Sequence, residues 1–103
     1  MFPANLTIRE AHETDGHAVD RLATLDSAAP PLGALVVAEI DGDLVAAVPV
    51  AGGPAIADPF RPTAEIVHLL ELRAAQLRAA RRDARRPLRA RLGWAGHLRA
   101  AAR

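Results

Sequence analysis

Glu39 is the residue of this sequence with the best case for acid–base chemistry. It is the only acid within the otherwise apolar stretch 35–40. A carboxylate held in a strand can accept a proton as a general base. The alternative is structural: Glu39 stands at a strand end, where it faces water or pairs with an arginine. Glu39 is therefore a candidate catalytic residue that must be weighed against an ordinary surface role.

Two histidines near the N-terminus stand among acids, which is a mixture that metal sites also use. His12 and His17 lie close in sequence to Glu13, Asp15 and Asp20, and imidazole and carboxylate are both common metal ligands. A spacing of five residues does not place two imidazoles on one face of a helix. We therefore expect a solvated helix start here and no metal site.

The composition excludes several classes of chemistry and of fold. The 103 residues contain no Cys, so a disulfide framework, a cysteine zinc site and a thiol nucleophile are ruled out. No Ser-His-Asp arrangement, Walker loop or dinucleotide glycine pattern is present. The length favours one domain. The longest uncharged stretch, 44–57, contains two prolines and is too short for a membrane span, and without a leader pattern a cytoplasmic location is expected.

The charges are segregated along the chain although the formal net charge is only +1. Residues 1–72 hold three Arg and eleven acids, whereas residues 73–103 hold ten Arg and the single acid Asp83. The arginines expected to meet a partner are Arg78, Arg81, Arg82, Arg85 and Arg86. Pairing with the acidic body of the same chain or of a neighbour is the favoured interpretation. Nucleic-acid phosphates and an anionic membrane surface are the alternatives.

Hydrophobic periodicity predicts an α+β domain over 1–86: a small antiparallel meander sheet packed by one short and one long helix. The expected strands are 5–9, 35–40, 44–48 and 55–57. A tight hairpin at Asp41-Gly42 is the strongest local prediction, because glycine supplies the positive φ of a primed turn. Pro54 makes the last strand a sheet edge, since proline leaves a gap in a hydrogen-bond ladder.

The short helix is predicted to open at Thr14-Asp15, with Thr14 as cap and Asp15 as a first-turn acid, and to end near Asp26. The long helix is predicted to be capped by Thr63 and to run to Arg86, because Pro87 would disrupt it.

An apolar stripe is expected along the long helix. It includes Ile66, Leu70 and Leu77. The Arg- and Ala-rich tail, 87–103, is predicted to form a further helix or to be disordered.

Two motifs stand out within this order of elements: Leu6-Thr7-Ile8-Arg9-Glu10-Ala11, and the run from Val37 to Ala46 around the Asp-Gly turn. Together with the order of elements, they resemble the N-terminal half of the GCN5-related N-acetyltransferases, the GNAT family. The likeness covers about residues 6–86. It implies a GNAT-like half fold, and it implies an acetyl-CoA pyrophosphate at the N-terminus of the long helix, where amide groups favour a phosphate. The positions that correspond are Arg61, Thr63 and Ala64, with Glu39 as the base of an acetyl transfer.

The cofactor loop departs from the family pattern in ways that oppose a diphosphate. Pro62 has no N–H to donate, and Ala64 and Ile66 stand where the family has small or absent side chains. Glu65 brings a carboxylate towards the anion. The sequence also contains no Tyr, the residue that often serves the family as general acid. These departures predict a GNAT-like domain without independent catalysis, for which no cofactor is expected.

The leading hypothesis is therefore an interaction or regulatory module. An unfinished sheet favours a homodimer or a protein partner, which would use the stripe of the long helix or the sheet edge at 55–57. A minimal N-acetyltransferase that binds acetyl-CoA is the first alternative. A nucleic-acid binder that acts through the arginine tail is the second.

Overall fold

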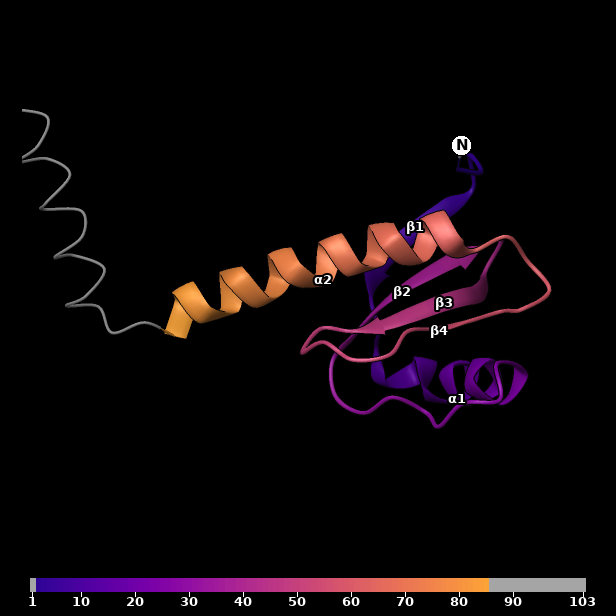
Figure 1. The fold of residues 1–103 in the computed structure, drawn as a ribbon, viewed down its shortest axis with the longest axis horizontal. Helices are drawn as coiled ribbons and strands as arrows, with labels where there is room; N and C mark the ends of the chain where they lie inside the picture. The colour runs from indigo at the N-terminus through magenta and orange to yellow at the C-terminus, as the bar shows by residue number, and fades with distance from the viewer. Residues whose placement is uncertain (1, 86–103) are drawn as a thin grey trace, which may run out of the picture.

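The computed structural model describes residues 2–85 and has the α+β architecture expected from the sequence (Figure 1). The elements are β1 (Leu6–Glu10), the 3-10 turn η1 (Glu13–Asp15), α1 (Gly16–Leu25), β2 (Leu35–Ile40), β3 (Asp43–Pro49), β4 (Ile56–Ala57) and α2 (Ala64–Arg85). The four strands form one antiparallel sheet in the order β1-β2-β3-β4, which confirms the meander. Arg86 and the tail 87–103 lie outside the described residues.

The Asp41-Gly42 turn confirms the hairpin prediction. Both residues have positive φ, 53° at Asp41 and 86° at Gly42, as a type I′ turn requires. The turn joins Ile40 directly to its cross-strand partner Asp43. It therefore sets the register of the two central strands.

A bulge in β3 was not predicted from the sequence. Glu39 pairs with Leu44 and Ala38 with Ala46, so Val45 has no opposite residue on β2. Val45 and Ala46 both pack into the core that faces α2, although successive residues of a regular strand point to opposite faces. The bulge thus restores the alternation for the rest of β3.

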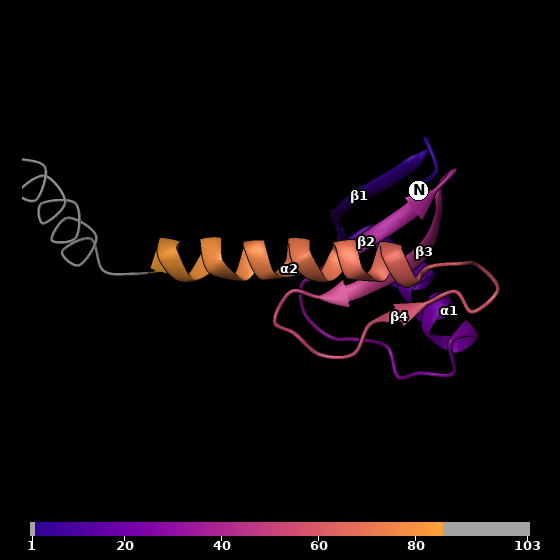
Figure 2. The ribbon, with the colours of Figure 1, turned by 45° about the horizontal axis from the view of Figure 1, so that its top comes forward.

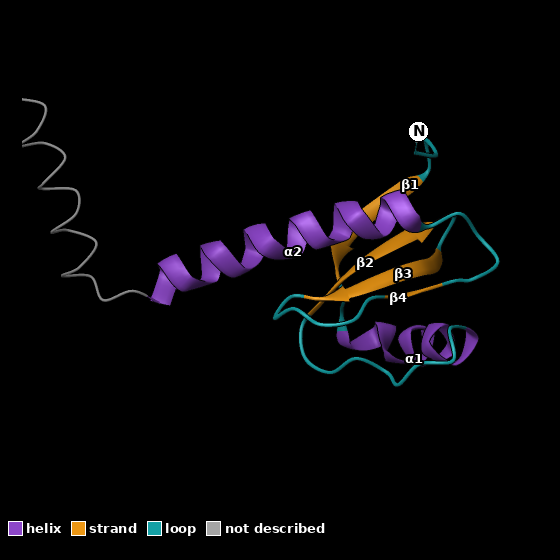
Figure 3. Ribbon diagram, viewed as in Figure 1, coloured by secondary structure: helices purple, strands orange, loops and turns teal. Residues whose placement is uncertain are grey.

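The sheet is buried on both faces, with α1 against one face and α2 against the other (Figure 3). On the α2 side, Val36 and Val48 pack against Leu70 of the helix. On the α1 side, Val37 packs with Leu22. The near-continuous apolar run of β2 predicts burial on both faces, and the structure confirms it.

The stripe of α2 belongs to the core of this chain, which corrects the expectation that it serves a partner. Ile66 and Leu70 are 4% and 0% exposed, and Leu77 is partly buried against the same cluster. These side chains cover the sheet, because burying one face of a sheet takes precedence over leaving an apolar stripe in water.

The sheet edge at β4 is also covered. The amide of Ala57 donates to Asp26 Oδ2 at 3.0 Å, and Ile56 is 2% exposed. A carboxylate from the end of α1 thus occupies the outward donor that a partner strand would need. This corrects the expectation of a partner at 55–57.

The C-terminal part of α2 continues past the sheet (Figures 1 and 2). Its last turn carries Arg82 and Arg85, which stabilises the negative end of the helix dipole. No helix of residues 2–85 has the length and apolar character of a membrane span.

Candidate functional site

The N-terminus of α2 borders a cleft of about 800 Å³. The structure brings Arg61, Thr63 and Ala64 together in its wall, beside Glu65 and Ile40. Thr63 accepts the first helical hydrogen bond from the amide of Val67 at 2.8 Å, which confirms it as the residue that opens the helix. The three positions that the family resemblance points to therefore share one cleft.

The charges of this cleft are less favourable to an anion than the position of the helix suggests. Arg61 Nε lies 3.6 Å from Asp58 Oδ2, and Arg61 Nη2 lies 3.8 Å from Asp43 Oδ2. These long, exposed pairs add little stability, but they place two carboxylates beside the guanidinium group. Glu65 adds a carboxylate in the first helical turn, where it already uses the positive end of the helix dipole.

Glu39 is held in an ion-pair network that we call the Arg9 clamp. Arg9 Nε donates to Glu39 Oε1 at 3.1 Å. The other two nitrogens of the guanidinium group donate to Asp15 Oδ2 at 2.7 Å and Oδ1 at 2.9 Å. This bidentate arrangement is the geometry in which arginine binds a carboxylate most strongly. Pairing with an arginine, the structural alternative for Glu39, is thus the arrangement found.

The Arg9 clamp also changes the protonation of Asp15 and the start of α1. The hydrogen bonds from Arg9, and then that from the backbone amide of His12 at 2.6 Å, lower the pKa of Asp15 to about 2. The same pairing raises the pKa of Arg9. Asp15 was expected as a first-turn acid of the short helix. Asp15 lies in the first turn of η1, which leads into α1, and its carboxylate accepts the amide of His12, the residue that precedes η1. The predicted cap, Thr14, lies inside η1, and α1, which begins at Gly16, has no side-chain cap.

Glu39 and the cleft lie on opposite faces of the sheet. Ile40 lines the cleft and packs with the cluster under α2, and neighbouring residues of a strand point to opposite sides. Ala11, two residues after Arg9, packs with the cluster under α1. The candidate base and the candidate cofactor positions are therefore not brought together.

A second hollow lies near the other end of α2, and we call it the basic groove. Its volume is about 320 Å³, and its walls are the α2 arginines and two loops. The arginines are Arg78, Arg81, Arg82 and Arg85. The loops supply residues 32–34 before β2 and 50–51 after β3. The sequence pointed to these arginines but carried no signal for the loops, because neither loop has a charged side chain at these positions.

The histidines near η1 do not form a metal site. Within residues 2–85, no group of three His, Cys, Asp or Glu side chains converges in a way that could hold a metal ion. Asp15, one of the acids beside His12, is committed to Arg9.

Searches of protein-family models, of curated proteins and of solved structures found no match to this chain. The two hollows at the ends of α2 and the Arg9 clamp are therefore interpreted from their own geometry.

Proposed function

We propose that this chain is a small GNAT-like binding module that performs no acyl transfer of its own. The observation that supports this most strongly is the separation of Glu39 from the cleft at Arg61 by the thickness of the sheet. A general base must come within hydrogen-bond reach of the proton that it removes. Glu39 is also engaged by Arg9 at 3.1 Å, so its carboxylate is occupied in the fold itself.

The binding surface of the module is the arginine-bearing half of α2. Within residues 2–85, Arg82 and Arg85 take part in none of the ion pairs described above. This part of the helix also extends beyond the sheet (Figure 1). Guanidinium groups in such a position favour an anionic partner.

Self-association is part of this proposal and is placed at β1. The amide of Ala11 donates to the carbonyl of Leu35, so by the alternation of an antiparallel ladder the amide of Ile8 faces away from β2. Two copies of β1 can pair about a twofold axis, which gives a closed and self-complementary interface. β1 forms the outer edge of the sheet in Figure 2.

Light scattering across a concentration series checks this association. We expect the mass of a dimer at micromolar concentration, because the edge of β1 from Ile8 onward is a template for pairing, whereas the outward amide of Leu6 already donates to the carbonyl of Pro3 at 3.2 Å. A monomer mass throughout the series would contradict the dimer and leave the proposal about acyl transfer standing.

A minimal acetyl-CoA-dependent N-acetyltransferase is the second candidate. One observation favours it: the cleft of about 800 Å³ has Arg61, Thr63 and Ala64 in its wall, and clefts of this size accommodate cofactors. In this alternative the amides that open α2 would hold the diphosphate.

Calorimetry with acetyl-CoA separates the two candidates. We expect wild type and the Arg61→Ala variant to give the same titration, because Arg61 is paired with Asp58 and Asp43 and Glu65 repels an anion at the helix start. A micromolar Kd that Arg61→Ala weakens by about tenfold or more would support the enzyme instead, since one charge-assisted contact accounts for a change of this size.

A further inference from the structure

The basic groove has more positive charge than the fold itself neutralises. Arg81 pairs with Glu10. Arg78 Nη1 donates to the carbonyl of Val50 at 2.8 Å, which fixes the side chain but leaves its charge uncompensated. Arg82 and Arg85 also line the groove. Three guanidinium charges therefore face the groove without a carboxylate in its lining.

The acidic body of the chain is a poor source of the missing anion. Five of its carboxylates are already in ion pairs with arginine within the described residues: Glu10, Asp15, Glu39, Asp43 and Asp58. Asp26 accepts the amide of Ala57. Six of the twelve acidic side chains are thus engaged within the fold, and none of the twelve is among the residues that line the groove, so the anion that we assign to the groove comes from outside the chain.

The shape of the groove favours a compact ligand. Two loops wall it, residues 32–34 and 50–51, and its volume is about 320 Å³. A polymer that follows a convex basic helix has no need of such walls, whereas a small ligand gains burial from them. The amide of Val50 donates to the carbonyl of Ala34 at 2.9 Å, which joins the two loops, and the hydrogen bond from Arg78 to Val50 ties them to α2. The walls of the groove are therefore held together before any ligand arrives.

The chemistry of the lining favours phosphate over carboxylate. Guanidinium groups bind phosphate oxygens through paired N–H donors. One phosphate group carries a charge of about −1.5 to −2 at neutral pH, so three uncompensated arginines match two adjacent phosphate groups better than a single carboxylate. This inference deepens the proposed function and rests on its assignment of the arginine half of α2 as the binding surface.

We infer that the basic groove binds a small molecule that carries two adjacent phosphate groups, with Arg82 and Arg85 as its principal ligands. Arg78 supports the site from the wall that it shares with Val50. The ligand sits at the end of α2 opposite to the cleft beside Arg61.

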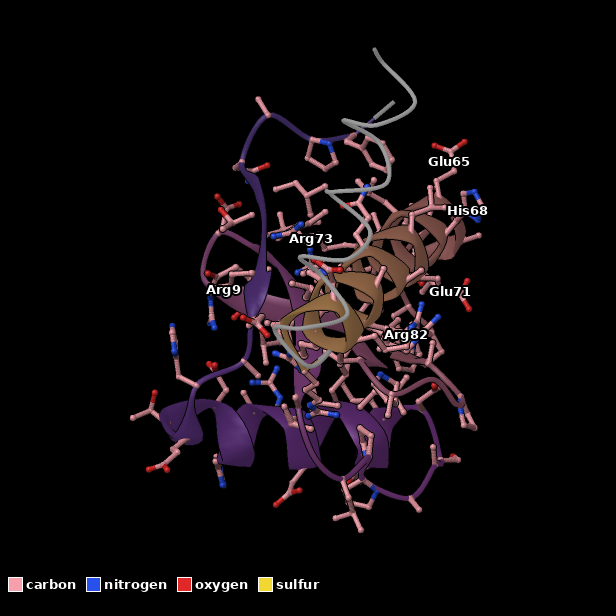
Figure 4. The ribbon with its side chains drawn as sticks, turned by 90° about the vertical axis from the view of Figure 1, so that its left-hand side faces the viewer. Arg9, Glu65, His68, Glu71, Arg73 and Arg82 are labelled. Atoms are coloured by element: carbon pink, nitrogen blue, oxygen red, sulfur yellow. The ribbon has the colours of Figure 1, made fainter. Side chains whose placement is uncertain are left out.

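Calorimetry with inorganic pyrophosphate tests the inference. We expect a Kd below about 1 mM for the wild-type chain, and at least a tenfold weaker Kd for Arg82→Ala/Arg85→Ala because two charge-assisted contacts are lost. Arg73→Ala is the matched control. Arg73 lies nine residues before Arg82 on the same helix, which places it on the opposite side, as Figure 4 shows. It hydrogen-bonds Gln76, and its removal should leave the Kd unchanged.

Three outcomes would overturn the inference. The first is the absence of pyrophosphate binding by the wild-type chain, and the second is equal weakening of the Kd by the Arg73 and the Arg82/Arg85 variants. The third is tighter binding of a single-stranded oligonucleotide than of pyrophosphate, with a steep dependence on salt, which would assign the surface to nucleic acid. Equal thermal unfolding of the variants shows that the fold is intact. Neither outcome changes the acetyl-CoA comparison at Arg61, so the two proposals fail separately.

Discussion

We expect the Leu70→Ala variant to lose about 3 kcal/mol of the free energy of unfolding. Leu70 is fully buried at the centre of the contact between α2 and the sheet, where it packs with Ile66, Ala74 and the valines of β2 and β3. Truncation leaves a cavity in a core whose neighbours are already small, so the surroundings can collapse only in part. Because small domains are only marginally stable, this is a large share of the total.

Leu72→Ala is the matched control for that experiment, since it removes the same atoms from the same helix two residues away. Leu72 is 50% exposed, and its truncation should change the free energy of unfolding by no more than about 0.5 kcal/mol. Urea unfolding of both variants measures the difference. Equal losses would mean that α2 does not pack on the sheet through Leu70, and the positions of both hollows would then be in doubt.

The second large effect is expected at the Arg9 clamp. Arg9→Met keeps most of the aliphatic stem but removes the guanidinium group, so the Asp15 and Glu39 carboxylates lose the group that holds them together. The side chains of all three residues are largely shielded, with 26%, 13% and 23% exposed. We expect a loss of about 2 kcal/mol at pH 7, below the cost of breaking a fully buried pair.

The loss should depend on pH in a defined direction. The pKa of Asp15 is lowered from 3.8 to about 2, first by the hydrogen bonds from Arg9 and then by the amide of His12, so the contribution of its charge to stability is complete above about pH 4 and disappears as the pH falls through 2. The difference in the free energy of unfolding between wild type and Arg9→Met should therefore become smaller as the pH falls from 5 to 2. Urea unfolding at several pH values measures this difference. Arg21→Met is the control, because Arg21 is an exposed residue of α1 that takes no part in the clamp. A gap that stays constant over this range would show that the clamp does not depend on the charge of Asp15.

Local signals predicted much of the fold. The Asp41-Gly42 turn was predicted because few residue pairs adopt positive φ at both positions, and the structure has both. The bounds of β2 agree with the predicted strand 35–40, and α2 begins at Ala64, directly after the predicted cap Thr63. The predicted end at Arg86 lies outside the described residues. These elements depend on periodicity and capping, which are properties of neighbouring residues.

The features that the sequence did not predict depend on contacts between distant residues. Val45 is a bulge residue only because β2 sets the register opposite it. Asp15 lies in the first helical turn, as predicted. Its pairing with Arg9 of β1 and the hydrogen bond from the amide of Ala57 to Asp26 were not predicted. The same limit applies to the candidate site. The sequence identified the residues at each end of α2, but it did not predict on which face of the sheet Glu39 lies.

The central claim is that a diphosphate binds in the basic groove and not at the N-terminus of α2. An amide NMR titration with coenzyme A tests it most directly, because its diphosphate can bind at either end of α2. The account predicts chemical-shift changes in residues 32–34, 50–51 and 78–85 around the basic groove, and none in residues 61–66. Changes centred on Thr63 and Ala64, with the groove unaffected, would contradict it and return the diphosphate to the start of the helix.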